Sequence, residues 1–254
     1  MGIRALRMTT LLVALATFAP VAGVAEGGPR AGSSPVQRQP PKATIKGGHD
    51  QKSAWLTAEY RELQLRKRSE KASPAITIEL RAGTDLVTIS VAPKNVVVWR
   101  GGRRVAVDSP TALQSLQQLL GSSPAIFGVR AMLSDLEPVS ALDAPDMALL
   151  STAAFVASLV GDVGAPLRLA DRFMEKHRGI FRQVRGSSYC WGSYSSEVSS
   201  AWNDLQACMD DAEYRGFFRS AYERLACNAV WILRSESAWF QYLKCLSPLS
   251  AIPQ

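Results

Sequence analysis

The sequence predicts an α+β protein, with a small antiparallel β-meander at about residues 75–107 followed by a mainly helical, disulfide-stapled C-terminal half. Three observations support this class. Apolar and polar residues alternate in short segments between residues 76 and 107, which is the period of half-buried strands. From residue 109 onward, apolar residues recur at helical spacing behind proline-containing helix starts. All four cysteines lie in the last third of the chain, at Cys190, Cys208, Cys227 and Cys245.

Residues 1–25 have the pattern of a secretory signal peptide. Arg4 and Arg7 precede an apolar run from Leu11 to Ala22, and small residues lead to an expected cleavage after Ala25. This run is about 12 residues long, whereas a membrane-spanning helix needs roughly 20. We therefore expect a secreted or periplasmic protein with no transmembrane segment after signal cleavage.

Residues 26–74 carry most of the net charge of the chain. Residues 26–52 are rich in Gly, Pro, Ser, Lys and Gln, and predict a disordered basic spacer because they offer too little apolar surface to offset ordering entropy. Residues 53–74 are expected to form a short amphipathic helix, since Leu56, Tyr60 and Leu63 recur at helical spacing. The alternation of Leu63 with Leu65 leaves a strand as the alternative.

The charge distribution bears on the class of partner. Residues 26–74 contain ten Lys/Arg against five Asp/Glu, whereas residues 75–254 contain seventeen of each. Proteins that bind nucleic acid through a folded domain usually carry excess positive charge on that domain. We therefore expect no nucleic-acid partner, and the basic N-terminal region instead suggests contact with an anionic envelope component.

Residues 75–186 are expected to hold the meander and the helices that cover it. Ile76, Ile78 and Leu80 begin the alternation, and Gly101-Gly102 predicts a two-residue hairpin that requires positive φ. Helices are expected to begin after Ser109, Ser123, Asp143 and Gly164, because proline follows each at the first or second helical position, and the fourth helix is expected to end near Gly186.

Two features of the predicted helices bear on how they pack. The segment 145–160 is apolar on most sides, which is typical of a helix buried within a protein core. Residues 166–186 are rich in arginine, whereas residues 194–213 carry five acidic residues and no Lys or Arg. We expect these two oppositely charged helices to pack against each other, although exposed ion pairs contribute little.

Residues 187–254 are expected to form a four-cysteine helical module. The intervals between cysteines are 18, 19 and 18 residues, and a helix of that length spans about 27 Å. A disulfide requires Cα atoms within about 7 Å, so neighbouring cysteines should not pair unless a turn separates them. An up-down-up bundle predicts the alternate pairing Cys190–Cys227 and Cys208–Cys245. A single hairpin with a turn near Gly216 would instead give the nested pairing Cys190–Cys245 and Cys208–Cys227.

The sequence offers little material for catalysis. Its two histidines are His49, in the predicted spacer, and His177, which we expect on the surface of an arginine-rich helix. A thiolate at Cys190 would need a nearby base, and no histidine follows it in the chain. The cysteines are not arranged in the close pairs of structural zinc sites, and no Gly-rich phosphate loop occurs. No cofactor, metal or catalytic residue is therefore expected.

These observations favour an exported non-catalytic protein that binds another protein or an anionic component of the cell envelope. One alternative is a secreted hydrolase that uses carboxylates, for which the candidates are Asp210, Asp211, Glu213 and Glu223. A second alternative is a secreted membrane-active toxin or effector, which would have to expose the apolar helix at 145–160.

Overall fold

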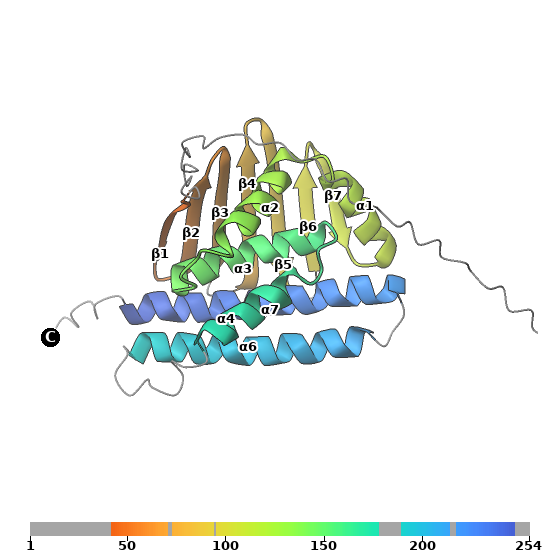
Figure 1. Ribbon diagram of the computed structural model, residues 1–254. Coiled ribbons are helices and arrows are strands. Elements are labelled where there is room, and N and C mark those ends of the chain that lie inside the picture. Colours follow the sequence, from red (N-terminus) through yellow and green to blue (C-terminus); the bar gives the residue numbers. More distant parts are fainter. Residues whose placement is uncertain (1–41, 71–72, 94, 178–188, 214–216, 247–254) are drawn as a thin grey trace, which may run out of the picture. The chain divides into compact units, whose positions relative to one another are not determined.

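The computed structural model describes residues 42–70, 73–93, 95–177, 189–213 and 217–246. Within them, one antiparallel sheet pairs each strand with the next along the chain: β1 (Thr44–His49), β2 (Ser53–Tyr60), β3 (Leu63–Glu70), β4 (Ser73–Ala82), β5 (Asp85–Ala92), β6 (Asn95–Arg100) and β7 (Arg103–Val107). The helices that follow are α1 (Pro110–Leu120), α2 (Pro124–Leu136), α3 (Ala144–Leu159), α4 (Ala165–His177), α6 (Tyr189–Glu213) and α7 (Phe217–Leu246). The predicted α+β class, a meander followed by helices, is confirmed (Figure 1).

The sheet begins earlier in the chain than the sequence predicted. Residues 44–49 form β1, so the predicted disordered spacer cannot extend to residue 52. Residues 53–70 form β2 and β3, and the predicted amphipathic helix is therefore wrong. The strands form because Ala54, Leu56, Ala58 and Tyr60 bury one face at period two. In the hairpin turn between them Arg61 has a φ angle of 51°. Glycine or asparagine usually occupies such a position, so the sequence does not indicate this turn.

Contacts with α2 hold that hairpin in place. The Tyr60 hydroxyl donates to Asp135 on α2, and the Arg61 guanidinium forms an ion pair with the same carboxylate at 2.8 Å. Burial, followed by the hydrogen bond to Asp135, raises the pKa of Tyr60 to about 12. The predicted glycine hairpin is also confirmed, since Gly101 and Gly102 have φ angles of 54° and 75°.

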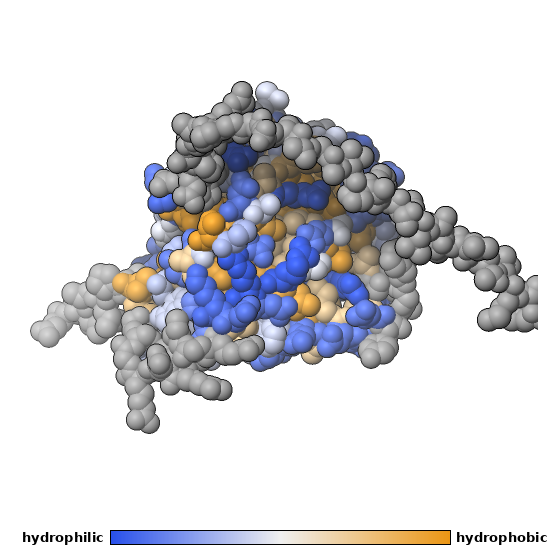
Figure 2. All heavy atoms as spheres, in the orientation of Figure 1, coloured by the Kyte–Doolittle hydropathy of each residue, from blue (hydrophilic) through white to orange (hydrophobic). Residues whose placement is uncertain are grey.

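One face of the sheet, the inner face, packs against the helices. Its central row crosses the strands through Gly47, Leu56, Lys67, Ile78, Ile89, Val98 and Val105. In Figure 1, α2 and α3 lie across this face, and α7 crosses it close to the strand ends. Gly47 is required there, because a Cβ atom at this position would lie 2.8 Å from the Trp239 ring of α7. Figure 2 shows the helical side of the fold, where hydrophilic and apolar side chains are interspersed.

The helix starts and the buried helix follow the sequence closely. The side chains of Ser109, Ser123 and Asp143 cap α1, α2 and α3 by accepting backbone N–H groups, as expected of N-cap residues. Every residue of α3 from Met147 to Leu159 is buried, which confirms the predicted core helix. The fourth helix is described as far as His177, and the rest of its predicted length lies outside the described residues.

The two helices of opposite charge are neighbours, as predicted. The Trp202 indole of α6 donates to Asp171 of α4 at 2.8 Å. The described ion pairs of the acidic helix, however, run to α7, where Arg234 pairs with Asp204 and Arg224 lies 3.7 Å from Glu213. The charge difference therefore identified the neighbour correctly, whereas the described ion pairs connect α6 to a different helix.

The disulfides are nested, and the predicted alternate pairing is wrong. Cys190 is bonded to Cys245 and Cys208 to Cys227, with Cα separations of 5.5 and 5.8 Å. The reason is that α7 is continuous through Cys227, so α6 and α7 form an antiparallel hairpin instead of three shorter helices. Each helix holds its two cysteines 18 residues apart, which is about five turns, so both face the neighbouring helix. Two disulfides fit an oxidising compartment.

None of the helices in the described part of the chain is both long and apolar enough to cross a membrane.

Candidate functional site

The carboxylates proposed for a hydrolase lie away from any described cavity. Asp210, Asp211 and Glu213 are exposed near the C-terminal end of α6, and Glu223 is half-buried on α7. Adjacent residues of a helix point in different directions, so Asp210 and Asp211 do not face a common point. The Glu213 side chain is 73% exposed beside Arg224. These residues therefore do not form an enclosed acid–base pair.

His177 is a core residue, and the expectation that it lies on the surface is wrong. Its side chain is buried between Phe173 and Trp191, with ring centroids 4.6 and 5.3 Å away, and its Nε2 atom lies 3.2 Å from the Leu142 carbonyl oxygen. Burial lowers the pKa of His177, which favours the neutral ring. Cys190 is engaged in a disulfide, so no Cys–His nucleophile forms between these residues.

A buried ion pair connects the middle of the sheet to α7. Lys67, on β3, pairs with Glu236 of α7, and their side chains are 1% and 3% exposed. The Ser69 hydroxyl donates to the second oxygen of Glu236 at 2.9 Å, and Lys67 Nζ lies 3.4 Å from the Ala148 carbonyl oxygen of α3. This cluster is not evident from the sequence, because Lys67 lies within a run of exposed basic residues.

This cluster does not have the arrangement of an activated nucleophile. Ser69 and Glu236 do line a cleft of ≈ 440 Å³ between the sheet and α7. However, one oxygen of Glu236 is paired with the Lys67 ammonium and the other accepts a hydrogen bond from the Ser69 hydroxyl, so the three side chains are committed to one another. We therefore interpret the three side chains as a structural connection between β3 and α7.

The opposite face of the sheet, here called the open sheet face, is not covered by the described helices (Figure 1). Hydrogen bonds and ion pairs that join strand side chains to helices come from inner-face residues such as Tyr60, Lys67 and Arg100. Strand pairing defines two rows of neighbouring residues on the open face. The first contains Lys46, Thr57, Arg66, Glu79, Thr88, Trp99 and Arg104, and the second contains Gly48, Trp55, Arg68, Thr77, Ser90, Val97 and Ala106.

Two tryptophans stand on the open sheet face. Trp55 is 40% exposed and its ring lies over Gly48, where a Cβ atom would come within 2.7 Å of it. Trp99 is 38% exposed, with the Arg104 guanidinium 5.9 Å from its ring centroid. Each indole is thus held by a neighbouring strand while a large part of it remains accessible, as is common for aromatic side chains at protein interfaces.

Charge on the open sheet face is predominantly positive. Its cationic side chains are Lys46, Arg66, Arg68, Arg81 and Arg104, and its carboxylates are Glu59, Glu70 and Glu79. The excess is two positive charges, one contributed by β1 to β3 and one by β4 to β7. The open sheet face can therefore attract an acidic surface.

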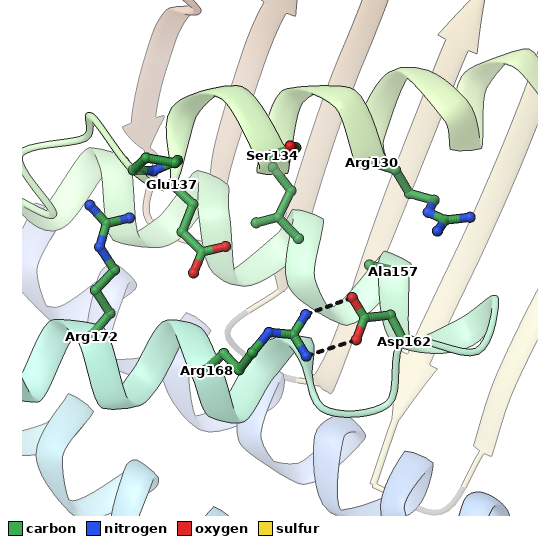
Figure 3. A pocket seen from close by; sticks show the side chains of 9 residues that line it. Arg130, Ser134, Glu137, Ala157, Asp162, Arg168 and Arg172 are labelled. Carbon is green, nitrogen blue, oxygen red and sulfur yellow. Dashed lines mark hydrogen bonds and ion pairs between the residues drawn. The ribbon is translucent and has the colours of Figure 1, made fainter. Parts of the chain in front are cut away.

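A second candidate is a cleft on the helical side, here called the arginine cleft (Figure 3). It has a volume of ≈ 710 Å³ and lies between α2 and α4. Arg130 comes from α2, Arg168 and Arg172 come from successive turns of α4, and Glu137 follows the end of α2. The remaining lining residues are Leu133, Ser134, Pro138, Ala157 and Asp162.

One arginine of this cleft has an internal partner. Arg168 forms a bidentate ion pair with Asp162, with Nη1–Oδ1 and Nη2–Oδ2 distances of 3.0 and 2.7 Å. The hydrogen bond to Asp162 raises the pKa of Arg168, and the charge of Glu137 adds to this effect. In Figure 3 the Arg130 and Arg172 guanidinium groups lie toward opposite ends of the cleft. The described residues provide neither of them with a hydrogen-bond or ion-pair partner.

Comparison of the chain with protein families, with curated proteins and with solved structures found no match. Function is therefore inferred from the chemistry of the open sheet face and of the arginine cleft.

Proposed function

We propose that this protein is an exported, non-catalytic binding protein, secreted or periplasmic, whose open sheet face binds an acidic surface of another protein. The observation that carries the proposal is the open sheet face itself, which extends over seven described strands and combines five cationic side chains with two accessible tryptophans. Tryptophan and arginine are the residue types most enriched among those that dominate binding energy at protein interfaces. The signal-like pattern of residues 1–25 and the two disulfides support export.

The size of the open sheet face suits a protein partner. Six strand spacings of about 4.8 Å give a width of about 29 Å, and six residues along a strand span about 20 Å. The projected area is therefore roughly 600 Å², before side-chain relief is added, against roughly 800 Å² that each partner contributes to a standard interface. A partner that covers most of this face would reach the size class of specific complexes.

Sheet twist favours a shaped protein over a flat lipid surface. Neighbouring strands rotate by about 20–25°, so the face normal turns by roughly 90° between β2 and β6. We therefore expect Trp55 and Trp99, which lie on those two strands, to point in different directions, which disfavours entry of both into one membrane plane. A protein surface that follows the twist can contact both.

Charge favours an acidic partner over two other occupants. A second copy of the chain would bring a like-charged face into contact, which is unfavourable. The chain's own segment 26–41 is also basic, since it carries Arg30 and Arg38 against Glu26. An acidic surface gains both electrostatic attraction and burial of the indoles.

Site-specific photocrosslinking tests the proposal directly. A photoreactive residue in place of Thr57 or Thr88, both on the open sheet face, should yield one discrete crosslinked protein when oxidised, mature protein is mixed with the envelope or secreted fraction of its source. The reversal R66E/R68E should weaken capture of that protein at least tenfold, and rising salt should weaken capture by the wild type. The matched control R130E/R172E changes two helical-side arginines and should leave capture unchanged.

Three results would contradict the proposal. Equal capture by R66E/R68E would exclude the open sheet face as the acidic partner's site. Crosslinks confined to residues on the helical side would place the interface elsewhere. Saturable binding to anionic vesicles that requires both Trp55 and Trp99 would identify a lipid surface as the partner instead.

A further inference from the structure

The arginine cleft contains three charges that the described fold leaves uncompensated. Both carboxylate oxygens of Asp162 bind Arg168, and within the described residues Asp162 forms no ion pair with Arg130. Arg172 forms no ion pair within the described residues, and neither does Glu137, which acts on Arg168 through its charge alone. The cleft thus presents two guanidinium groups and one carboxylate to solvent.

The geometry of the cleft restricts what can occupy it. Arg168 is fixed between the two other arginines by its two-pronged bond to Asp162, and it therefore acts as part of the wall. Leu133, Pro138 and Ala157 supply apolar surface between the charged groups. The volume of ≈ 710 Å³ falls within the range of about 300–1,000 Å³ that is typical of small-ligand sites.

We propose that the arginine cleft binds a short acidic peptide with a free amino terminus. Its two carboxylates, one from an acidic side chain and one from the C-terminus, bind Arg130 and Arg172. Its ammonium group binds Glu137, and its apolar portion contacts the floor formed by Leu133 and Ala157. This ligand matches the uncompensated charges of the cleft in number and sign, which a simple dianion does not, because Glu137 would repel it.

Arginine suits this role because its planar fork can bind a carboxylate through two parallel hydrogen bonds. The pairing of Arg168 with Asp162 also removes a competing carboxylate that would otherwise neutralise a neighbouring guanidinium. This proposal is independent of the open sheet face, which lies on the other side of the sheet from the described helices.

Binding of the tripeptide Glu-Leu-Ala to the oxidised full chain, measured by titration calorimetry, tests the proposal, because its side-chain and C-terminal carboxylates lie at opposite ends of the peptide. Three analogues each lack one charge: the N-acetyl form, the C-terminal amide, and Gln-Leu-Ala. We expect each to bind at least about tenfold more weakly than the parent peptide, because each leaves one charged group of the cleft without its partner. R130M and R172M should each weaken binding of the parent to a similar extent.

A thermodynamic cycle isolates the amino-terminal contact. E137Q should weaken binding of the free-amine peptide but leave binding of its N-acetyl form unchanged, because that form has no ammonium to lose. R81M, which changes a cation on the open sheet face, is the matched control and should bind like the wild type. Absence of saturable binding at millimolar peptide would overturn the proposal. Equal affinities for wild type and R130M/R172M would overturn it as well, and thermal unfolding curves would show that these variants are folded.

Discussion

Removal of the Glu236 carboxylate should destabilise the protein strongly, because it leaves the Lys67 ammonium buried without a counter-charge. The two side chains are 3% and 1% exposed, and Lys67 lies between Leu56 and Ile78 in the central row of the inner face. In E236M the hydrogen bond that Lys67 retains is the one to the Ala148 carbonyl oxygen, at 3.4 Å from Lys67 Nζ. Breaking a buried pair by removing one partner costs about 3–5 kcal/mol.

The double variant K67M/E236M should recover most of this loss. Both charges disappear together, and methionine fills similar space within an apolar surrounding, so the desolvation penalty of the pair is removed along with its attraction. We expect the double variant to lie within about 1 kcal/mol of the wild type. S69A, which removes one hydrogen bond to Glu236 and leaves the ion pair intact, should cost about 1 kcal/mol.

Urea unfolding of the oxidised protein measures these differences. With a slope near 2 kcal/mol per molar urea, a loss of about 3–5 kcal/mol shifts the midpoint of E236M down by about 1.5–2.5 M. The coupling energy from the cycle of K67M, E236M and the double variant should therefore amount to several kcal/mol. Equal midpoints for E236M and K67M/E236M would refute the reasoning, because they would show that Lys67 finds another way to satisfy its charge.

Three further predictions concern packing, crosslinks and pH. G47A should cost about 1–3 kcal/mol in thermal unfolding, because the new Cβ atom would lie 2.8 Å from the Trp239 ring. G192A, whose Cβ atom meets nothing within 4 Å in α6, should instead stabilise by about 0.5–1 kcal/mol. Peptide mapping without reduction should return the disulfides Cys190–Cys245 and Cys208–Cys227, and recovery of Cys190–Cys227 would contradict the nested hairpin. Replacement of the first pair by serine should lower the free energy of unfolding by about 4 kcal/mol, and replacement of the second pair by about 3 kcal/mol, because the closed loops span 55 and 19 residues. Burial alone would raise the pKa of Asp85, but hydrogen bonds from Ser123 and Arg100 hold it below its usual 3.8. Its stabilisation is therefore fully present above that pH and lost as pH falls through the folded-state pKa, so the stabilities of wild type and D85N should differ at pH 7 and converge in acid.

The sequence predicted the strands β4 to β7 but missed β1 to β3, and the buried side chains of these two parts of the sheet differ in size. Between residues 76 and 107 the buried positions are large and mostly branched, as at Ile78, Ile89 and Val98, so the alternation is evident. In β2 two buried positions are alanine, and in β3 one is Lys67, whose burial depends on a carboxylate almost 170 residues away. Local pattern cannot reveal a strand whose inner face is completed by a distant residue.

The disulfide pairing depended on where the helices end. Assigning one helix to each interval between cysteines placed a break near Cys227, but the buried side of α7 continues through Cys227 to Trp231 and Trp239. The equal intervals of 18 residues were visible in the sequence. They indicate two helices in antiparallel register as readily as three helices in a bundle, and length alone does not separate these arrangements.

The candidate binding surfaces were only partly visible in the sequence. The arginine-rich segment that became α4 was recognised, but its relation to Arg130 requires the packing of α2 beside α4. The basic run Arg66-Lys67-Arg68 lies within the segment 53–74 that the sequence predicted to be an amphipathic helix. Because the segment forms the strand β3, these side chains alternate between the two faces of the sheet: Arg66 and Arg68 lie on the open sheet face, and Lys67 lies in the core.

The contacts of α7 with the earliest strands impose an order on folding. A chain that emerges N-terminus first, from a ribosome or a translocation channel, exposes Gly47 and Lys67 long before Glu236 and Trp239 are available to meet them. Until then the nascent meander holds an unneutralised ammonium on the surface that it must bury, which disfavours premature compaction. The native state can therefore form only after nearly the whole polypeptide has been synthesised or translocated. The disulfide between Cys190 and Cys245 can then form and stabilise the folded structure.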